Sequence, residues 1–156
     1  MPLWAEISFV VPGFRGMIHL TKDRMHERRV GMKTIISTPD APKAIGPYSQ
    51  AVRYGDLLFV SGMLGMDPKT GEFAGNDIES QAVRILENLK AVIEAAGMTL
   101  QNVLKSTVFL KDMNDFAKFN EIYGRYFPEA PPARETVQVA KLPRDAAIEI
   151  SVICGK

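Results

Sequence analysis

The stretch IESQAVRILENLKAVIEAA, residues 78–96, sets the architecture expected for this chain. Its apolar residues recur at steps of three and four, the spacing that places side chains on one face of an α-helix. These residues are Ile78, Ala82, Ile85, Leu86, Leu89, Val92, Ile93 and Ala96. Asn76 or Asp77 is available as the N-cap, and Gly97 follows as a stop. The pattern predicts an amphipathic helix that packs one face against a core.

The residues before this helix have the alternation of short β-strands. Residues 33–37 predict one strand, and residues 50–54 and 57–66 predict a hairpin around Gly55 and Asp56. A turn or loop is expected at residues 67–71, because Asp67, Pro68 and Gly71 are typical turn residues.

The residues after the helix predict three more strands and a second helix. Residues 103–111 alternate as a strand with one shared face, formed by Leu104, Ser106, Val108 and Leu110. Residues 114–127 predict a helix that presents Phe116, Phe119, Tyr123 and Phe127, ended by prolines at 128, 131 and 132. Residues 134–140 and 146–154 predict two final strands around a turn at 142–145.

The predicted order of elements is β-β-β-α-β-α-β-β. Two helices can cover only one face of a sheet of about six strands, so the fold class is α+β with helices on one face. The uncovered face needs a partner, and we expect this chain to oligomerise through it.

Composition restricts the class of protein. A chain of 156 residues that is 46% hydrophobic can bury the core of one domain without disulfides or a metal. Its 19 Lys and Arg against 18 Asp and Glu give a net charge of +1, which does not favour binding to nucleic acid or to an anionic membrane. The lone Cys154 cannot form an intrachain bridge, and no apolar run approaches the roughly 20 residues that span a bilayer. We therefore expect a cytoplasmic protein.

The positions of the histidines exclude several catalytic centres. Both of them, His19 and His26, precede residue 32. A domain of residues 32–156 thus has no Ser-His or Cys-His pair, no two-histidine ribonuclease centre and no ordinary His/Cys zinc site. Catalysis there would use carboxylates, arginine, hydroxyls, backbone groups and water, and no metal site is predicted.

Residues 1–31 are predicted to lie outside the fold, as an N-terminal extension to the domain at 32–156. The apolar residues of the extension show no helical or strand periodicity, and Pro12-Gly13 interrupts its apolar stretch. It lacks the features of a signal peptide, and it fits a mitochondrial presequence poorly because Glu6, Asp23 and Glu27 are acidic. A third interpretation takes Met32 as the natural start. If Arg28 and Arg29 are both encoded AGG, these codons form a purine-rich ribosome-binding site just before Met32, and the DNA sequence would test this.

The last two strands contain the residues best suited to chemistry. Arg134, Thr136 and Gln138 share one face of the first strand, and Val137 is expected to point to the helices instead. Glu149 lies between Ile148 and Ile150, on the side opposite to them. If these two strands pair, Arg134 and Glu149 emerge together on the uncovered face.

This pair of side chains suits a small acidic substrate. A guanidinium can grip a carboxylate through two parallel hydrogen bonds, and a carboxylate in a partly dry site can move a proton to or from water. The pair therefore suggests hydrolysis of a small acid. An intersubunit salt bridge without chemistry is the alternative.

Other positions are weaker candidates. Tyr48, after the turn at Gly46-Pro47, can place its hydroxyl over a pocket or can simply pack. Ser61 and Gly62 mark a close approach of backbone to a ligand or chain, or a bulge. Asn120 can donate an amide hydrogen bond or can be solvated. Cys154 falls in the apolar register of the last strand and is interpreted as core.

Five motifs lie in order between about residue 32 and the end of the chain. They are Ile45-Gly46-Pro47-Tyr48-Ser49-Gln50, Phe59-Val60-Ser61-Gly62, Lys111-Asp112-Met113-Asn114-Asp115-Phe116, Pro132-Ala133-Arg134, and Leu142-Pro143 followed by Ile148-Glu149-Ile150. Together these motifs resemble the RidA/YjgF family of enamine/imine deaminases.

The resemblance implies a chorismate-mutase-like (YjgF-like) fold and a homotrimer with three pockets at the subunit interfaces. It also implies hydrolysis of reactive 2-enamino or 2-imino acids to 2-keto acids and ammonia, without a cofactor. Arg134 would hold the substrate carboxylate, and Glu149 would position or activate the attacking water. The remaining lining residues implied by the resemblance are Tyr48, Ser61, Gly62 and Asn120.

Three positions depart from the family pattern. The family commonly has a small residue and then a cysteine after the arginine, whereas this chain has Glu135 and Thr136. Glu135 is expected to face away from Arg134, while Thr136 keeps a hydroxyl in the pocket for a water or substrate and changes its size and polarity. Met63 replaces the usual glutamine after Ser61-Gly62.

Two alternative functions remain at this point. A non-catalytic trimer that binds small carboxylates and regulates a partner would use the same Arg134. A ribonuclease or translation inhibitor is disfavoured, because residues 32–156 hold 14 basic and 15 acidic residues, no histidine and no basic stripe.

Overall fold

The computed structural model describes residues 32–156, and the predicted N-terminal extension, residues 1–31, lies outside the described residues. The strands are β1 (Lys33–Ile36), β2 (Ala51–Tyr54), β3 (Leu57–Leu64), β4 (Val103–Leu110), β5 (Ala133–Gln138) and β6 (Ile148–Gly155). The helices are α2 (Ile78–Ala95) and α3 (Phe116–Tyr126), with short 3-10 turns η1 (Leu100–Asn102), η2 (Met113–Asp115) and η3 (Pro143–Asp145). The predicted order of strands and helices is confirmed.

The six strands form one mixed sheet in the order β1-β2-β3-β6-β4-β5. Neighbouring strands are antiparallel except β4 and β5, which are parallel. The predicted pairing of the last two strands is wrong, because β4 lies between β5 and β6. Helix α3 connects β4 to β5, and such a strand-helix-strand crossover places the second strand parallel to the first. β5 is therefore an edge strand.

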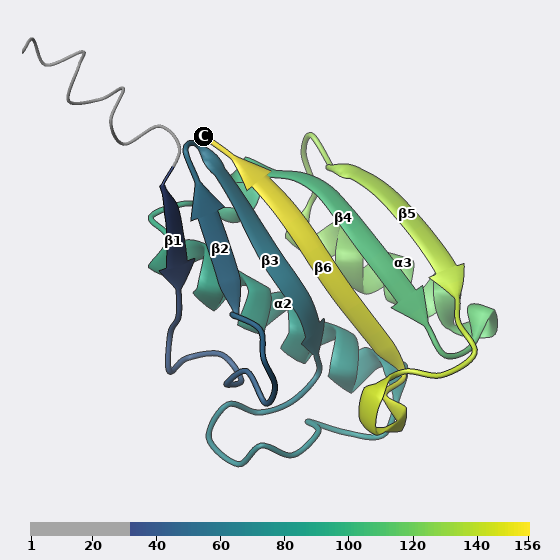
Figure 1. The fold of residues 1–156 in the computed structure, drawn as a ribbon. Helices are drawn as coiled ribbons and strands as arrows, with labels where there is room; N and C mark the ends of the chain where they lie inside the picture. Colours follow the sequence, from purple (N-terminus) through teal and green to yellow (C-terminus); the bar gives the residue numbers. More distant parts are fainter. Residues whose placement is uncertain (1–31) are drawn as a thin grey trace, which may run out of the picture.

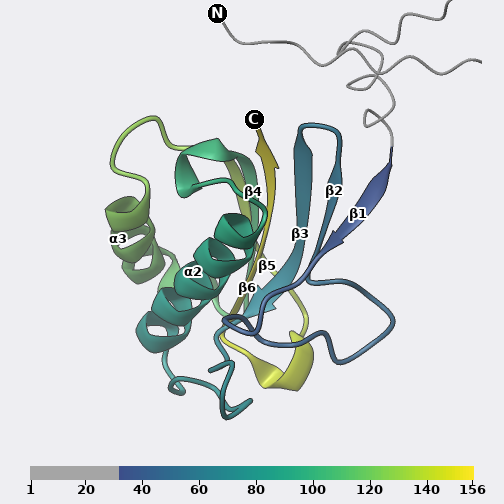
Figure 2. The ribbon, with the colours of Figure 1, turned by 90° about the vertical axis from the view of Figure 1, so that its left-hand side faces the viewer.

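Both helices cover the same face of the sheet. Figure 2 shows α2 and α3 together on one side of the sheet, and in Figure 1 they lie behind the strands, so that view looks onto the opposite, open face. Helix α2 begins where predicted, because the Asp77 carboxylate accepts a hydrogen bond of 2.8 Å from the backbone N–H of Ser80. It ends before Gly97, whose φ of 72° suits glycine.

The core lies between the sheet and the helices. Ile85, Leu89 and Ile93 of α2 are fully buried against the strands, as is Cys154 of β6. In β4, Ser106, Val108 and Leu110 are buried as predicted, but Leu104 is 53% exposed. The prediction fails there because a register shift between Val103 and Lys105, opposite β6, turns Leu104 out of the alternation.

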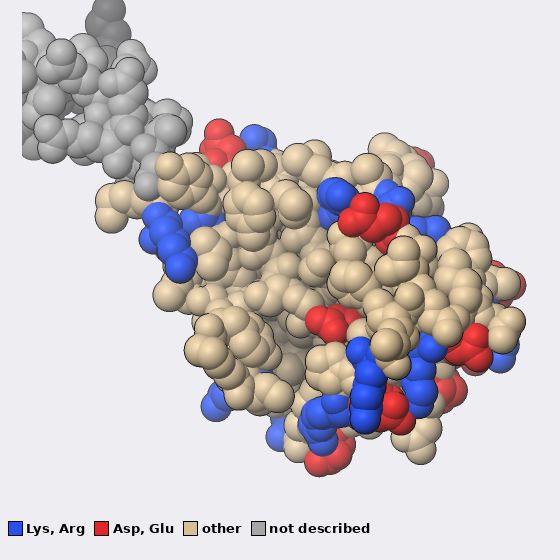
Figure 3. Space-filling view, turned by 45° about the vertical axis from the view of Figure 1, so that its right-hand side comes forward, with Lys and Arg blue, Asp and Glu red and all other residues tan. Residues whose placement is uncertain are grey.

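The open face of the sheet is largely apolar although no other element of residues 32–156 covers it. Exposed apolar side chains lie on four of its strands and beside the bulge of β4. They are Ile35, Tyr54, Leu57, Phe59, Leu104 and Val137. Figure 3 shows mostly uncharged residues over the strands, charged residues toward the margins, and an acidic group in a hollow near the middle of the view. A face of this kind is typical of an interface.

The faces of β5 are the reverse of those predicted. Val137 pairs with Phe109 of β4 on the open face, and it is 46% exposed. Arg134 pairs with the fully buried Ser106, which lies on the helix side, and Thr136 pairs with the buried Val108. Arg134 and Thr136 therefore face the helix layer, and Val137 does not.

Replacing Asp77 by alanine tests the cap of α2. We expect the variant to lose about 1 kcal/mol of unfolding free energy near neutral pH, measured by urea denaturation, because the carboxylate satisfies a free N–H of the first turn. The backbone N–H of Ser80 holds the pKa of Asp77 below its ordinary value. The stabilisation is thus present above the ordinary aspartate pKa and is lost as the pH falls through the lowered one.

Glu94→Ala, near the other end of the same helix, is the matched control. Its carboxylate lies close to the negative end of the helix dipole, so its removal is expected to leave stability unchanged or slightly higher. Equal losses in both variants would contradict the cap assignment.

Candidate functional site

The predicted site residues fall into two groups on opposite faces of the sheet. Glu149 pairs with Leu64 of β3 and with Phe109 of β4, on the open face. Arg134 faces the helices, as described above. The prediction that both emerge on the uncovered face of one chain is therefore wrong. Its premise, direct pairing of β5 with β6, fails because β4 separates them.

The first group lies on the open face at the end of β3. Tyr48, Ser61 and Gly62 line one small hollow of about 50 Å³. The Glu149 carboxylate, from β6, lies against Gly62 at the border of this hollow, since a Cβ added at Gly62 would overlap it. A register shift between Val60 and Met63 produces this close approach. The structure thus brings four of the predicted residues together, and we call them the Glu149 half-site.

The walls of this hollow are fixed by hydrogen bonds to the backbone. The Ser61 hydroxyl donates to the carbonyl of Ser49 at 2.7 Å, and the Tyr48 hydroxyl accepts from the N–H of Ile45 at 3.4 Å. Gln50 is 5% exposed, and its amide accepts from the N–H of Thr38 and donates to three carbonyls of residues 38–42. The role of Gln50 in holding this wall was missed, although it lies within a quoted motif. A buried amide gives no periodic signal in a sequence.

Glu149 is half-buried and unpaired. Its side chain makes no hydrogen bond or ion pair with any other residue of 32–156. Burial raises the pKa of Glu149 above that of an ordinary glutamate, because the charged form loses hydration. A carboxyl group with a raised pKa and no fixed partner is suited to accept and return a proton.

The second group lies between β5 and α3, and we call it the Arg134 half-site. Arg134 is half-buried, and its Nη2 donates to Oδ1 of Asn120 at 2.6 Å. The guanidinium carbon lies 4.6 Å from the ring centre of Tyr123, 5.4 Å from that of Phe119 and 5.8 Å from that of Phe116. No carboxylate within residues 32–156 pairs with it. Its charge is therefore available to an anion.

Three buried hydroxyls belong to residues next to Arg134 in the fold. Thr136 Oγ1 has no hydrogen-bond partner among residues 32–156, and Ser106 Oγ and Tyr123 Oη have only each other as a nearby partner there. Burial raises the pKa of Tyr123, so it remains a neutral phenol. Buried hydroxyls usually find a partner, so these groups suit a water or a bound polar ligand. The aromatic residues of α3 were predicted as helix packing only, and their contact with Arg134 was missed.

Two predictions about neighbouring residues are confirmed. Glu135 faces away from Arg134, since it accepts from the Thr107 hydroxyl at 2.8 Å and pairs with Lys105 at 3.1 Å. Cys154 is buried core, and burial raises the pKa of its thiol to about 11, which keeps it protonated. Met63 is 5% exposed and belongs mainly to the core, although it also borders the hollow.

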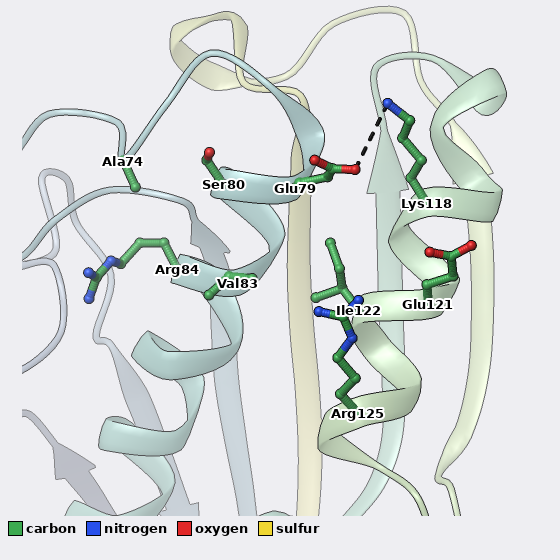
Figure 4. A pocket seen from close by; sticks show the side chains of 9 residues that line it. All are labelled: Ala74, Glu79, Ser80, Val83, Arg84, Lys118, Glu121, Ile122 and Arg125. Atoms are coloured by element: carbon green, nitrogen blue, oxygen red, sulfur yellow. Dashed lines mark ion pairs between the residues drawn. The ribbon is translucent and has the colours of Figure 1, made fainter.

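A separate groove of about 460 Å³ lies on the outer surface of the helix layer, between α2 and α3 (Figure 4). It carries charges of both signs, and the Glu79 and Lys118 side chains meet across it at 3.9 Å. None of the predicted site residues lines it. Within residues 32–156, no cluster of three or more His, Cys, Asp or Glu side chains can hold a metal ion. The helices of this part of the chain include none long and apolar enough to cross a membrane.

Comparison with known proteins identifies several relatives. The family profile described as Endoribonuclease L-PSP matches residues 38–155. A RutC family protein of Saccharolobus solfataricus is 58% identical over 125 residues, which cover 80% of this chain and 99% of that protein. Reactive Intermediate Deaminase A, chloroplastic, of Arabidopsis thaliana is 46% identical over 121 residues, 78% of this chain and 65% of that protein. A crystal structure of a putative endoribonuclease from Thermotoga maritima has a TM-score of 0.78 at 52% identity, covering 80% of this chain and 98% of that one.

The environment of Glu149 predicts an unusual pH dependence of stability. Because its pKa is raised by burial, the folded chain keeps a proton that the unfolded chain releases as the pH rises from about 4.5. Stability from this group is present below the ordinary pKa and is lost as the pH rises through the raised one. Glu149→Gln is therefore expected to have a higher Tm than the wild type at about pH 8, with a smaller difference at about pH 4.

Glu135→Gln is the control on the same face. Hydrogen bonds from Thr107 and Lys105 hold the pKa of Glu135 below its ordinary value, so its contribution has the opposite sign with pH. This control is expected to be no more stable than the wild type at about pH 8. A Glu149→Gln variant that melts lower than the wild type there would disprove the assignment.

Proposed function

The chain belongs to the Endoribonuclease L-PSP family, also called YjgF/RidA, and from this premise we propose that it is a cofactor-independent hydrolytic deaminase. Its substrates are reactive 2-enamino and 2-imino acids, and its products are 2-keto acids and ammonia. The family indicated by the motifs and the α+β fold class predicted from the order of strands and helices are both confirmed. The similarity to Reactive Intermediate Deaminase A supports a deaminase in general.

One observation carries the proposal: each half-site holds an unpaired charge of the sign that the other half-site lacks. Among residues 32–156, Arg134 contacts a neutral amide and aromatic rings but pairs with no carboxylate, and Glu149 pairs with no cation. The hollow at Glu149 is far smaller than the roughly 300–1,000 Å³ typical of a ligand pocket. A complete pocket therefore needs both half-sites, and one chain keeps them on opposite faces.

A homotrimer would join them. β5 is an edge strand, so Arg134 lies at the margin of the sheet, where a second chain can approach. The apolar open face supplies the contact surface. If the β5 margin of one protomer packs on the open face of the next, Arg134 of one faces Glu149 of the other. Cyclic symmetry then repeats the pocket three times.

The proposed reaction needs orientation and proton transfer more than a strong nucleophile. Arg134 binds the substrate carboxylate through two parallel N–H bonds and holds the imine carbon toward Glu149. Glu149 takes a proton from water as the water oxygen bonds to the carbon of the protonated imine, and the C=N π electrons move to nitrogen, which forms a carbinolamine. Glu149 then returns that proton to the amino nitrogen. As the C–N bond breaks, the hydroxyl proton passes back to Glu149 and the C=O bond forms, so ammonia and the 2-keto acid leave. An enamine substrate is first protonated at its β-carbon to give the same imine.

The alternatives use the same residues differently. A non-catalytic regulator that binds small carboxylates would need Arg134 but no proton carrier, so the unpaired Glu149 with its raised pKa favours an enzyme. A ribonuclease or translation inhibitor fits poorly, although some relatives carry the name endoribonuclease. Residues 32–156 offer neither a histidine pair nor an excess of basic residues.

Arg134→Ala tests the enzyme hypothesis directly. A dehydratase generates 2-aminoacrylate or 2-iminobutyrate in the assay, and formation of the keto acid is followed. Loss of the guanidinium should remove about 2–4 kcal/mol of transition-state binding, a fall in kcat/KM of about 30- to 900-fold. Arg125→Ala, in the groove on the outer helix surface, is the control and should keep wild-type activity. Equal rates for wild type and Arg134→Ala would defeat the proposal.

Glu149→Ala separates the enzyme from the regulator. It should abolish turnover while binding of 2-oxobutanoate, measured by calorimetry, persists.

A charge placed on the open face tests the assembly. Val137→Lys should convert the trimer to a monomer in light scattering and remove activity with it, because a lysine would have to be desolvated in the interface. Val83→Lys is the control, since Val83 is 40% exposed on the helix layer, away from the open face. A wild-type protein that is a monodisperse monomer would refute the shared pocket.

A further inference from the structure

We propose that Asn120 and the rings of Phe116, Phe119 and Tyr123 form a positioning cage that fixes the Arg134 guanidinium without neutralising its charge. The proposal rests on the proposed function in one respect, that Arg134 binds the carboxylate of a small acid. The four residues position Arg134, and they do not need to touch the reacting atoms.

The contacts of the guanidinium involve no anion. One edge, Nη2, donates to the neutral amide oxygen of Asn120 at 2.6 Å. The rings of Tyr123, Phe119 and Phe116 lie within 4.6–5.8 Å of its central carbon. Aromatic faces attract a guanidinium through their quadrupole, and they contribute no formal charge. The cation is therefore held in place while its remaining N–H groups stay free for a carboxylate.

Arg144 provides an internal comparison. Its guanidinium also lies over an aromatic ring, that of Phe73 at 5.5 Å, but it pairs with the Glu72 carboxylate at 3.5 Å and donates to the Gly71 carbonyl at 2.8 Å. Those contacts use the arginine to hold a loop. Arg134 has the ring contacts without the carboxylate, which is the difference expected of an arginine that must receive an anion from outside.

The carboxylate next in sequence is kept away from Arg134. Glu135 points to the open face, where Thr107 donates to it at 2.8 Å and Lys105 pairs with it at 3.1 Å. Side chains alternate between the two faces of a strand, which already places Glu135 on the face opposite to Arg134. The contacts with Thr107 and Lys105 fix the Glu135 carboxylate on that face. No carboxylate of residues 32–156 therefore pairs with the guanidinium.

Helix α3 anchors two members of the cage in the core. Its members recur at positions 116, 119, 120 and 123, which lie along one face of a helix. Phe119 is fully buried and Tyr123 is 5% exposed, and their rings pack together with centres 5.4 Å apart. Phe119 and Tyr123 therefore cannot move without disturbing the core. Asn120 is exposed and Phe116 is partly buried, so these two members complete the cage at its outer side.

Asn120→Asp is the decisive variant, because it changes the charge beside Nη2 with almost no change in shape. We expect the new carboxylate to pair with Arg134 and to compete with the ligand. Binding of 2-oxobutanoate, measured by calorimetry, should weaken at least tenfold, and KM should rise by a similar factor with kcat changed less than threefold. Asn120→Ala should weaken binding less than Asn120→Asp does.

The rings are tested by a pair of substitutions. Tyr123→Leu should weaken 2-oxobutanoate binding about fivefold, and Tyr123→Phe should restore most of it, because the cage requires the ring and not the hydroxyl. Urea denaturation checks folding, and Phe116→Leu replaces Tyr123→Leu if that variant does not fold, since Phe116 is only partly buried.

Equilibrium binding separates this proposal from the proposed function. Wild-type protein that binds 2-oxobutanoate through Arg134 but hydrolyses no imine would refute the enzyme and leave the cage intact, provided that Asn120→Asp weakens binding as expected. The cage is refuted if Asn120→Asp binds at least as tightly as Asn120→Ala, or if Tyr123→Phe and Tyr123→Leu bind alike. It is equally refuted if the wild type binds no 2-oxobutanoate.

Discussion

The crossover from β4 through α3 to β5 is the constraint on which the candidate site depends. It makes β5 a parallel edge strand, and the register of β5 with β4 then sets Arg134 beside Ser106, on the helix side. The same helix delivers the rings and the amide that hold the guanidinium. Because Glu149 belongs to the opposite face, a single chain presents two separate halves of a site. Association is thus a requirement of the proposed chemistry as well as of the exposed apolar surface.

The open face serves stability and function together. Two helices bury one side of a six-stranded sheet and leave Phe59, Leu57 and Val137 exposed on the other. In a monomer such a surface would be a liability, and in an assembly it drives association. Glu149 lies within this same face, so the burial that would stabilise the trimer would also deepen the desolvation that already raises its pKa. Packing and acid-base chemistry are therefore linked through one surface.

Sequence patterns predict the individual helices and strands correctly, but they do not predict the pairing of strands that are far apart in the sequence. The helix over residues 78–96 was found from its period and its caps, and the β2-β3 hairpin from a two-residue connection. The strands that pair with β6 could not be predicted in this way, because local sequence patterns do not determine which strands pair in a sheet. Leu104 was wrongly predicted to be on the buried face of β4, because the register shift beside it cannot be recognised from the alternation of apolar and polar residues. Val137 was assigned to the helices because it is apolar, a rule that fails where both faces of a sheet are apolar.

An arginine and a glutamate that faced each other in one chain would form a salt bridge and use up both charges. The sheet prevents this, since its two faces hold Arg134 and Glu149 apart, and the rings of α3 stabilise the cation without an anion. Each charge is thus unmatched within residues 32–156, and under the proposed function it is matched when assembly and ligand come together. In the proposed pocket the substrate carboxylate satisfies the arginine, and the substrate separates the arginine from the glutamate. Glu149 stays free to move a proton at the imine carbon for the same reason that Arg134 stays free to bind.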